Sequence, residues 1–336
     1  MKPHIVMISP ALANANNGNW QTASRWANFL RQRHAVTILP SNDPETWSSI
    51  DKPDLLVALH ARRSAAAMEA LRERYPDVPS IVVLTGTDLY RDIHVDTSAQ
   101  LNLQHAGRLV VLQEAGLQEL APAWREKACV IHQSAPSLKP IGAACKSRMP
   151  RFEVCMIGHL RAEKDPATFM QAAALLTSPG IRLTHIGGAL DAELAAMAEA
   201  TAAAHSHYRW LGSLAHDDVL HHLRRCHLMV LTSRMEGGAN VIIEALMCGV
   251  PVLASNISGN RGMLGEDYEG YFAVGDSAAL AQAIARAAAD SVFYKRLAEQ
   301  CQARAFLFTP EREEAAVQQL VDNMLNSKST NRNPFP

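Results

Sequence analysis

The sequence lacks several features that would indicate a redox, secreted or membrane protein. Its six cysteines form no Cys-x-x-Cys pair, and most lie in apolar or helix-like runs, where a reduced thiol packs as a small hydrophobic side chain. No apolar run reaches the roughly 18 residues that a membrane span needs, and the chain opens on a strand pattern instead of an export leader. We therefore expect a cytoplasmic protein with no membrane partner.

An excess of charge of either sign is also missing. The chain has 32 Lys and Arg residues against 33 Asp and Glu residues, so its formal net charge is only -1. Such a balance provides no global field that would attract nucleic acid or anionic lipid. A small molecule is the expected partner, and nucleic acid is not.

What the chain does have is length and hydrophobic content. Its 336 residues are 48% hydrophobic, which suits two domains of about 150 residues each with a cleft for a ligand. Short apolar runs alternate with helical patterns, as in a parallel α/β sheet. The predicted strands are residues 5–8, 55–59, 81–84, 109–112, 152–157, 183–186, 228–232 and 251–254.

Composition also sets the predicted boundaries. Prolines, a glycine and basic residues interrupt the β/α rhythm and predict a linker at residues 138–150, between domains 1–137 and 151–308. Thr309, Pro310 and the acidic residues after them begin a C-terminal helix, predicted at 309–327. The polar tail, 328–336, has nothing to bury and is predicted to be disordered.

The strongest chemical signal is the segment SRMEGGANVIIEALMCGVPVLAS, residues 233–255. A buried strand leads into Gly237 and Gly238 and then into an apolar helix that begins near Asn240. Glycines permit close approach of a ligand, and the N-terminus of a helix attracts a diphosphate. Glu236 and Glu244 are placed to accept hydrogen bonds from sugar hydroxyls in one crevice. The alternative is that Glu236 is only a turn residue and Glu244 only an exposed acid of the helix.

This segment resembles the signature of the two-Rossmann-domain (GT-B) glycosyltransferases of family 4, and the resemblance covers nearly the whole chain. It implies that Glu244 holds the donor ribose and that Glu236 faces the donor sugar. Residues 157–165, IGHLRAEKD, are similar to the diphosphate clamp of that family. Lys164 matches the lysine of the family, whereas His159 stands where arginine is usual, so we expect Arg161 to supply the missing cation unless it is a surface arginine.

The resemblance yields two groups of predicted residues in the second half of the chain. Positive charge is needed there because the departing nucleotide diphosphate gains negative charge in the transition state. The predicted catalytic residues are Lys164, Arg161 and Glu236. The predicted donor-binding residues are Gly158, His159, Gly237, Gly238, Ala239, Asn240, Glu244 and, from the first domain, Gly18.

We predict that the reaction needs no metal and no other cofactor. The chain contains no Asp-x-Asp pair, which metal-dependent glycosyltransferases of the other major architecture use to hold a divalent cation. The histidine pairs His205 with His207 and His221 with His222 diverge on a helix, and no cysteine or carboxylate completes a metal site. We interpret these histidines as surface residues.

Loops after the first three predicted strands of the N-terminal half carry unusual polar residues. Ligands of open α/β sheets bind outside the carboxyl ends of the strands, where these loops lie. Structural roles are the alternative. Arg62 and Arg63 can cover the sheet edge, Arg91 can pair with Asp88 or Asp92, and residues 17–19 can satisfy a turn. The predicted acceptor-binding residues are Asn17, Asn19, His60, Arg62, Arg63, Thr85, Gly86, Thr87, Asp88 and Arg91.

Four segments resemble a narrower group, the selenosugar synthases of selenoneine biosynthesis. They are NNGNWQTASRW (16–26), LHARRS (59–64), VLTGTDLYRDI (83–93) and LVVLQEAGL (109–117). This resemblance implies transfer of a sugar from UDP-N-acetylglucosamine or UDP-glucose to the selenium of selenophosphate. An anionic acceptor would explain the arginines, and Thr85 stands where members with sugar acceptors commonly have histidine. The alternative is a metal-independent glycosyltransferase acting on a sugar or metabolite hydroxyl.

The expected architecture is therefore α/β, with two doubly wound Rossmann-like domains facing a cleft and a C-terminal helix that packs back toward the N-terminal domain. UDP-sugar and selenophosphate are the expected partners, and a homo-oligomer is compatible with the sequence. A two-lobed binding protein of the periplasm is disfavoured because the chain shows no export signal.

Overall fold

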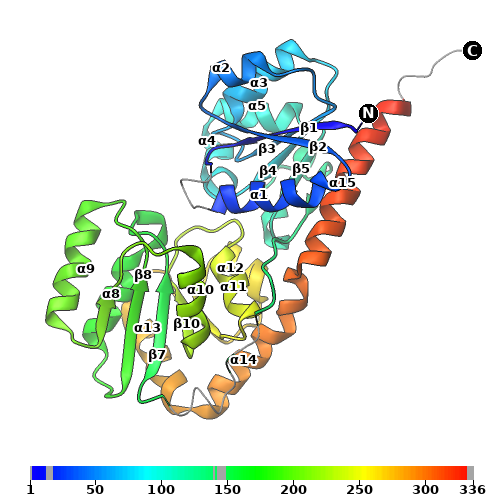
Figure 1. Ribbon diagram of the computed structural model, residues 1–336. Coiled ribbons are helices and arrows are strands. Elements are labelled where there is room, and N and C mark those ends of the chain that lie inside the picture. Colours follow the sequence, from blue (N-terminus) through cyan, green and yellow to red (C-terminus); the bar gives the residue numbers. More distant parts are fainter. Residues whose placement is uncertain (1, 13–17, 139–140, 142–148, 331–336) are drawn as a thin grey trace, which may run out of the picture. The chain divides into compact units, whose positions relative to one another are not determined.

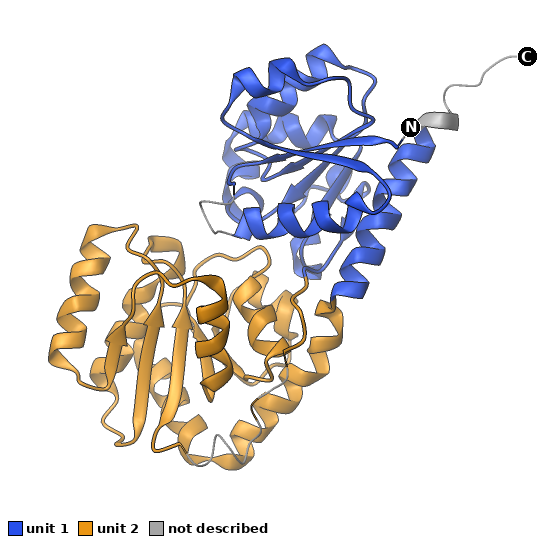
Figure 2. Ribbon diagram, viewed as in Figure 1, with its two compact units in different colours: residues 1–133, 310–336 blue, residues 134–309 orange. Residues whose placement is uncertain are grey.

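The computed structural model describes residues 2–138, except 13–17, together with residue 141 and residues 149–330 (Figure 1). It divides into two compact units (Figure 2). Unit 1 combines residues 1–133 with 310–336, and unit 2 is residues 134–309. The predicted linker, 138–150, lies mostly outside the described residues.

Unit 1 is built on a six-stranded sheet in which every strand pair is parallel. Its strand order is β2-β1-β3-β4-β5-β6, so the order reverses between β1 and β3. The strands are β1 (His4–Ser9), β2 (Ala35–Pro40), β3 (Leu55–Leu59), β4 (Ser80–Leu84), β5 (Arg108–Val111) and β6 (Ala128–Val130). The helices are α1 (Gly18–Arg31), α2 (Pro44–Ser49), α3 (Ala65–Arg74), η2 (Asp88–Asp92), α4 (Ile93–Val95), α5 (Thr97–His105), η3 (Glu114–Leu117), α6 (Pro122–Arg125) and α15 (Pro310–Thr330).

Both faces of this sheet are apolar, as burial under helices on both sides requires. Val6 and Ile8 of β1 belong to one core cluster, whereas Ile5 and Met7 point to the other, because successive side chains of a strand alternate between faces. Helices α3 and α5 cover the first face, and α1 with α15 cover the second (Figure 1).

The C-terminal helix α15 joins unit 1 through a buried carboxylate. Glu313 is 2% exposed, and its oxygens accept hydrogen bonds from Arg25 Nε at 2.6 Å and from Trp26 Nε1 at 2.7 Å. These donors from α1 compensate the cost of burying the charge. Val317 and Val321 continue the contact within the core, so the predicted return of the C-terminal helix to the N-terminal domain is confirmed. Helix α15 extends to Thr330, beyond the predicted end at 327.

Unit 2 is built on a second parallel sheet, in the order β12-β11-β10-β7-β8-β9. This is the classic Rossmann order, with the reversal between β7 and β10. The strands are β7 (Phe152–Ile157), β8 (Ile181–Ile186), β9 (Tyr208–Trp210), β10 (Leu228–Leu231), β11 (Val252–Ser255) and β12 (Tyr271–Phe272). The helices are η4 (Ala162–Lys164), α8 (Pro166–Leu175), α9 (Ala192–Ala204), α10 (His216–Arg225), α11 (Asn240–Met247), α12 (Ser258–Leu264), α13 (Ser277–Ala289), α14 (Ser291–Ala305) and η5 (Phe306–Phe308).

The two doubly wound sheets confirm the predicted α/β architecture. Strands β2, β6, β9 and β12 were not predicted; they are short or, in β2, largely half-exposed, so they lack a continuous apolar run. None of the helices that the structure describes combines the length and hydrophobicity needed to cross a bilayer.

Candidate functional site

The predicted donor residues of unit 2 gather at the reversal point of its sheet. Strands β7 and β10 are neighbours, and their carboxyl ends lead into residues 158–164 and 232–239. Open α/β sheets bind ligands at this point because the two connections diverge to opposite faces and leave a crevice. The structure thus brings the clamp segment and the Gly-Gly segment, which lie far apart in the sequence, to one place.

An ion pair joins the two segments. Lys164 Nζ lies 2.5 Å from Glu236 Oε1, and both side chains are largely buried, at 15% and 11% exposed. Ser233 Oγ also donates a hydrogen bond to the same carboxylate oxygen, at 2.6 Å. The site therefore holds one lysine and one hydroxyl on the same oxygen of one carboxylate.

Contacts among the surrounding residues hold the ends of this pair in place. Thr232 Oγ1 donates to the backbone oxygen of Lys164 at 2.8 Å, which ties β10 to the clamp. Helix α12 approaches so closely that a Cβ atom on Gly259 would lie 1.9 Å from the backbone oxygen of Glu236. Any larger residue at 259 would displace the backbone that carries Glu236.

His159 occupies the arginine position of the clamp as a neutral side chain. Its Nδ1 accepts a hydrogen bond from the backbone N–H of Gly188 at 3.0 Å, so the ring proton is carried by Nε2. Burial lowers the pKa of His159, and the charges of Arg161 and Lys164 lower it further. The positive charge of this segment therefore comes from Lys164 and from Arg161, which is exposed.

The Gly-Gly segment leads into the N-terminus of α11. Ala239 is the N-cap residue and its side chain makes no capping hydrogen bond, so backbone N–H groups at Asn240 and beyond are presented at the helix end. Glu244 lies in the second turn of α11, with Oε1 3.8 Å from His216 Nε2. Gly237 is buried, and Gly238 and Asn240 are half-buried.

The predicted acceptor residues of unit 1 also lie at a reversal point, between β1 and β3. Helix α1 begins at Gly18, which is exposed, and Asn19 is its second residue. Asn17 lies outside the described residues. Residues 60–64 follow β3, and residues 85–88 follow its neighbour β4.

Asp88 is a structural centre of these loops, and its role in acceptor binding stays a prediction. It is completely buried, and its oxygens accept backbone N–H groups of Ala61 at 2.8 Å, Thr85 at 2.9 Å and Gly86 at 2.8 Å. A carboxylate with three N–H donors is well stabilised in a buried position. Asp88 thus joins the loops after β3 and β4.

His60 belongs to the same buried cluster. It is 3% exposed with a φ of 69°, and its ring contacts Thr87 Oγ1 through Nε2 at 3.0 Å. Its Nδ1 accepts the backbone N–H of Arg63 at 3.3 Å. Burial lowers the pKa of His60, so the ring is neutral, with both nitrogens engaged by protein groups.

The three arginines predicted to bind the acceptor differ in their surroundings. Arg91 Nε lies 3.0 Å from Asp92 Oδ1, the pairing that the structural alternative proposed for it. Arg62 Nε lies 3.0 Å from Asp96 Oδ2, a pairing that was not predicted. Arg63 is exposed, and none of the described residues pairs with its guanidinium. Arg63 is therefore the arginine most available to an anion.

The described part of the chain contains no candidate metal site. Its His, Cys, Asp and Glu side chains form no group of three or more that could hold an ion. The prediction that all four paired histidines lie on the surface was too simple: His222 is half-buried, and His207 Nε2 contacts the backbone oxygen of Ala173 at 2.9 Å.

Several contributors to the site were not predicted. Ser233 lies inside the predicted segment, but its contact with Glu236 depends on the turn geometry. His216 approaches Glu244 from α10, and no motif in the sequence marks it. Arg234 Nη2 pairs with Asp165 Oδ2 at 3.0 Å, and this pair joins the connection after β10 to the connection after β7. Such pairs depend on strand order, which a local motif does not contain.

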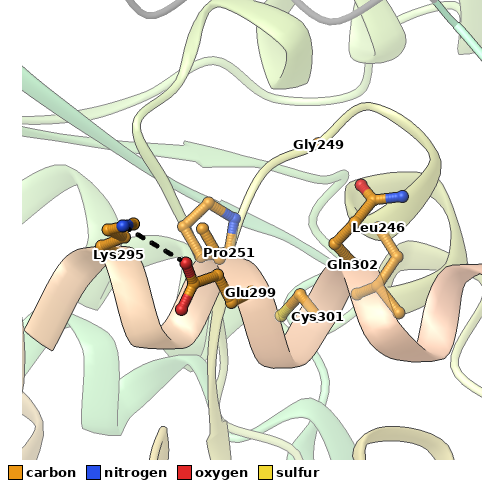
Figure 3. Close-up of a pocket in the computed structure, with 8 residues that line it drawn as sticks. Leu246, Gly249, Pro251, Lys295, Glu299, Cys301 and Gln302 are labelled. Atoms are coloured by element: carbon orange, nitrogen blue, oxygen red, sulfur yellow. Dashed lines mark ion pairs between the residues drawn. The ribbon is translucent and has the colours of Figure 1, made fainter.

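A cavity of about 330 Å³ lies elsewhere in unit 2, beside α14 (Figure 3). Pro251, which directly precedes β11, and Leu246 line one side, and Lys295 and Glu299 border it as an ion pair. Burial raises the pKa of the Cys301 thiol to about 11, so this lining cysteine stays protonated at neutral pH. The cavity includes none of the predicted site residues.

Comparisons with known proteins agree with this geometry. The family model of glycosyl transferases group 1 matches residues 144–325. An uncharacterized glycosyltransferase of Methanocaldococcus jannaschii is 34% identical over 68 residues, which is 20% of this chain and 19% of that protein. The matched segment thus spans less than a fifth of that relative.

Several solved structures are similar to this protein over almost its whole length. Anabaena HepE, in complex with UDP and glucose, has a TM-score of 0.75 and 18% identity, over 95% of this chain and 99% of its own. Sucrose-phosphate synthase of Thermosynechococcus elongatus has a TM-score of 0.79 and 17% identity, over 97% and 100%. These likenesses establish the two-domain GT-B fold, and the family match shows that the chain belongs to the glycosyl transferases group 1.

Proposed function

We propose that the protein transfers a sugar from a UDP-sugar bound at the reversal point of unit 2. The observation that carries this proposal is the contact between Lys164 and Glu236 beside the N-terminus of α11. In the proposed complex, Glu244 binds the ribose and Glu236 the hexose. Lys164, Arg161 and the first N–H groups of α11 stabilise the diphosphate as it leaves.

The UDP-sugar donor has independent support from a structural neighbour. HepE, which shares the fold at 18% identity, was solved with UDP and glucose, and a second structure of it contains UDP-glucose. The neutral state of His159 also fits the proposal, because the backbone contact with Gly188 fixes the ring and leaves the two cations to bind the anion.

Selenophosphate is the proposed acceptor. Arg63 presents a guanidinium that no described residue engages, and guanidinium groups bind phosphate oxygens through paired hydrogen bonds. His60 has both ring nitrogens engaged, so unit 1 offers no evident base there to deprotonate an acceptor hydroxyl. A selenium nucleophile that is already deprotonated needs no such base.

The proposed transfer is a single exchange at the anomeric carbon. The selenium of selenophosphate forms a bond to C1 of the sugar while the bond from C1 to the UDP oxygen breaks. UDP leaves with the electron pair of that bond, and the phosphate stays on selenium in the sugar product. Reaction of that product with water then releases phosphate and a 1-seleno sugar.

A hydroxyl acceptor is the second candidate, since the family fold is compatible with it. A screen of acceptors separates the two candidates. In one arm, selenophosphate is supplied together with UDP-N-acetylglucosamine or UDP-glucose, and in the other arm, simple sugars and alcohols replace selenophosphate. The products are identified by mass spectrometry. We expect a selenium-containing sugar only with selenophosphate. Efficient glycosylation of hydroxyls without any selenium product would refute the acceptor assignment while leaving the glycosyltransferase assignment intact.

A further inference from the structure

A second cavity of unit 2 concentrates basic side chains at the end of the sheet opposite the donor residues. It has a volume of about 300 Å³ and lies between the sheet and helix α10. Glu153 and Arg182, which border it, are each the second residue of their strands and face each other in register. The donor segments follow the other, carboxyl ends of the strands. The residues that define the charge of this cavity are Glu153, Arg182, Arg209, His221, His222 and Arg225.

Charged residues are unusual on this part of a parallel sheet. Strands covered by helices on both faces are normally apolar throughout. Here Thr184 and Arg209 are cross-strand partners on β8 and β9, beside Arg182. Arg182 and Arg209 are half-buried, so water solvates their charges only in part.

The cavity contains more positive than negative charge. Arg182 has a partner, because its Nη1 lies 3.5 Å from Glu153 Oε1. Arg209 donates through Nε to Thr184 Oγ1 at 2.9 Å, but neither it nor Arg225 has a carboxylate within ion-pair distance among the described residues. Two guanidinium groups are thus left uncompensated in one cavity.

The two histidines of α10 add further donors. Burial lowers the pKa of His222, and the nearby charges of Arg209, His221 and Arg225 lower it further, against the opposing effect of Asp218. Burial and, to a smaller extent, the neighbouring cations thus favour the neutral ring of His222. An anion in the cavity would oppose the effect of these cations and favour the protonated ring.

We propose that this cavity is a second ligand site, which binds a small anion carrying a phosphoryl group. Two uncompensated guanidinium groups match the charge of a phosphate dianion and the geometry of its oxygens. The volume is at the lower end of ligand pockets, which span about 300 to 1,000 Å³, so it suits phosphate, pyrophosphate or a small phosphate ester. The site is separate from the proposed donor site and can be occupied together with it.

Calorimetry on the full chain tests the proposal, with pyrophosphate and orthophosphate as separate probes. Each is titrated at constant ionic strength into protein saturated with UDP, so that the proposed donor site is already filled. We expect one binding event that Arg63→Ala, the variant of the proposed acceptor site, leaves in place. Arg209→Ala and Arg225→Ala should each weaken it by about tenfold or more, the effect of losing a charged hydrogen bond. Arg296→Ala, which removes a half-exposed guanidinium that pairs with Glu269 on the same unit, should leave it unchanged.

Arg225 is exposed at the end of α10, so its variant should fold even if that of Arg209 does not. A second readout is the titration of His222 by NMR, whose midpoint should rise when pyrophosphate is bound. Three results would overturn the proposal: no binding of either probe, binding that both cavity variants retain in full, or binding that is abolished by UDP.

Discussion

Lys164 and Glu236 form an ion pair at 2.5 Å although 72 residues separate them in the chain. One comes from the connection after β7 and the other from the connection after β10. The pair forms because these strands are neighbours at the point where the strand order reverses. In the free protein, Glu236 therefore compensates the cation that is proposed to bind the diphosphate.

The first prediction concerns donor affinity. Lys164→Ala and Glu244→Ala should each weaken UDP binding by about 1.5 to 3 kcal/mol, the range of a hydrogen bond to a charged group. Isothermal titration calorimetry with UDP measures this change. Lys295→Ala, which removes a lysine that is 76% exposed on α14, is the matched control. If both site variants bind UDP as tightly as the parent protein, the donor assignment fails.

The second prediction separates Glu236 from Lys164. Glu236→Gln keeps the size of the side chain but removes the charge that neutralises Lys164, so affinity for UDP alone should be retained or increased. Sugar transfer should slow by at least about tenfold, the equivalent of 1.4 kcal/mol in the barrier, because the carboxylate proposed to face the hexose is lost. Calorimetry and product assays give the two values. A parallel fall in UDP affinity would mean that Glu236 maintains the loop instead of contacting the sugar.

The third prediction concerns metal. Charge on the leaving diphosphate is proposed to be stabilised by Lys164, Arg161 and the N-terminus of α11, without a divalent ion. Transfer should therefore continue at an undiminished rate in excess EDTA. Activity that EDTA abolishes and that magnesium or manganese restores would disprove this account of the leaving group.

The fourth prediction is a pH dependence of the stability of unit 2. Burial lowers the pKa of His185 to about 4, and its Nε2 contacts the backbone oxygen of Gly158 at 3.1 Å. In the unfolded chain, a histidine has a pKa of about 6.5, so the unfolded state binds this proton first as pH falls. The contribution to stability is complete above pH 6.5 and declines toward pH 4, by roughly 3 kcal/mol in all.

His185→Gln removes this titration and serves as the comparison. Urea unfolding, monitored by pulsed hydrogen exchange in peptides from β7 and β8, follows the relevant unit. The loss of unfolding free energy between pH 7 and pH 4.5 should be smaller in the variant than in the parent protein. Equal losses in the two proteins would show that His185 does not titrate as its surroundings indicate.

The sequence was sufficient to predict the long buried strands and the position of two polar segments at their carboxyl ends. Apolar runs such as residues 55–59 and 152–157 identify central parallel strands because both of their faces are buried. The Gly-Gly segment was predicted from its place between a buried strand and a helix, and Lys164 from the resemblance to the family clamp; their role in binding the donor stays a prediction. Strand β2 was missed since its residues are mostly half-exposed and do not form a continuous apolar run.

The sequence was not sufficient to predict which charged groups pair with each other. Asp88 and the arginines look alike as polar loop residues, yet Asp88 is completely buried and Arg63 is exposed. The difference arises from three backbone N–H groups that converge on Asp88 from two loops, a consequence of tertiary structure. The basic cavity beneath α10 was missed for the same reason, because its arginines come from separate elements.

The fifth prediction concerns the acceptor and contrasts two adjacent arginines. Arg62 is engaged by Asp96 at 3.0 Å, whereas no described residue engages the guanidinium of Arg63. If a phosphate-bearing acceptor binds at the loops after β3 and β4, Arg63→Ala should raise the KM for selenophosphate by at least about tenfold, as for a lost charged hydrogen bond. Arg62→Ala should have a smaller effect, because its guanidinium already has a carboxylate partner.

Both variants should bind UDP as the parent protein does, since neither arginine belongs to unit 2. Arg63→Lys should recover part of the lost acceptor affinity, because it restores the charge without the paired donors of a guanidinium. Steady-state kinetics with varied selenophosphate, with the product followed by mass spectrometry, determine these values. A KM that is unchanged in Arg63→Ala, or a loss of UDP affinity as large as the loss of acceptor use, would place the anionic acceptor away from this loop.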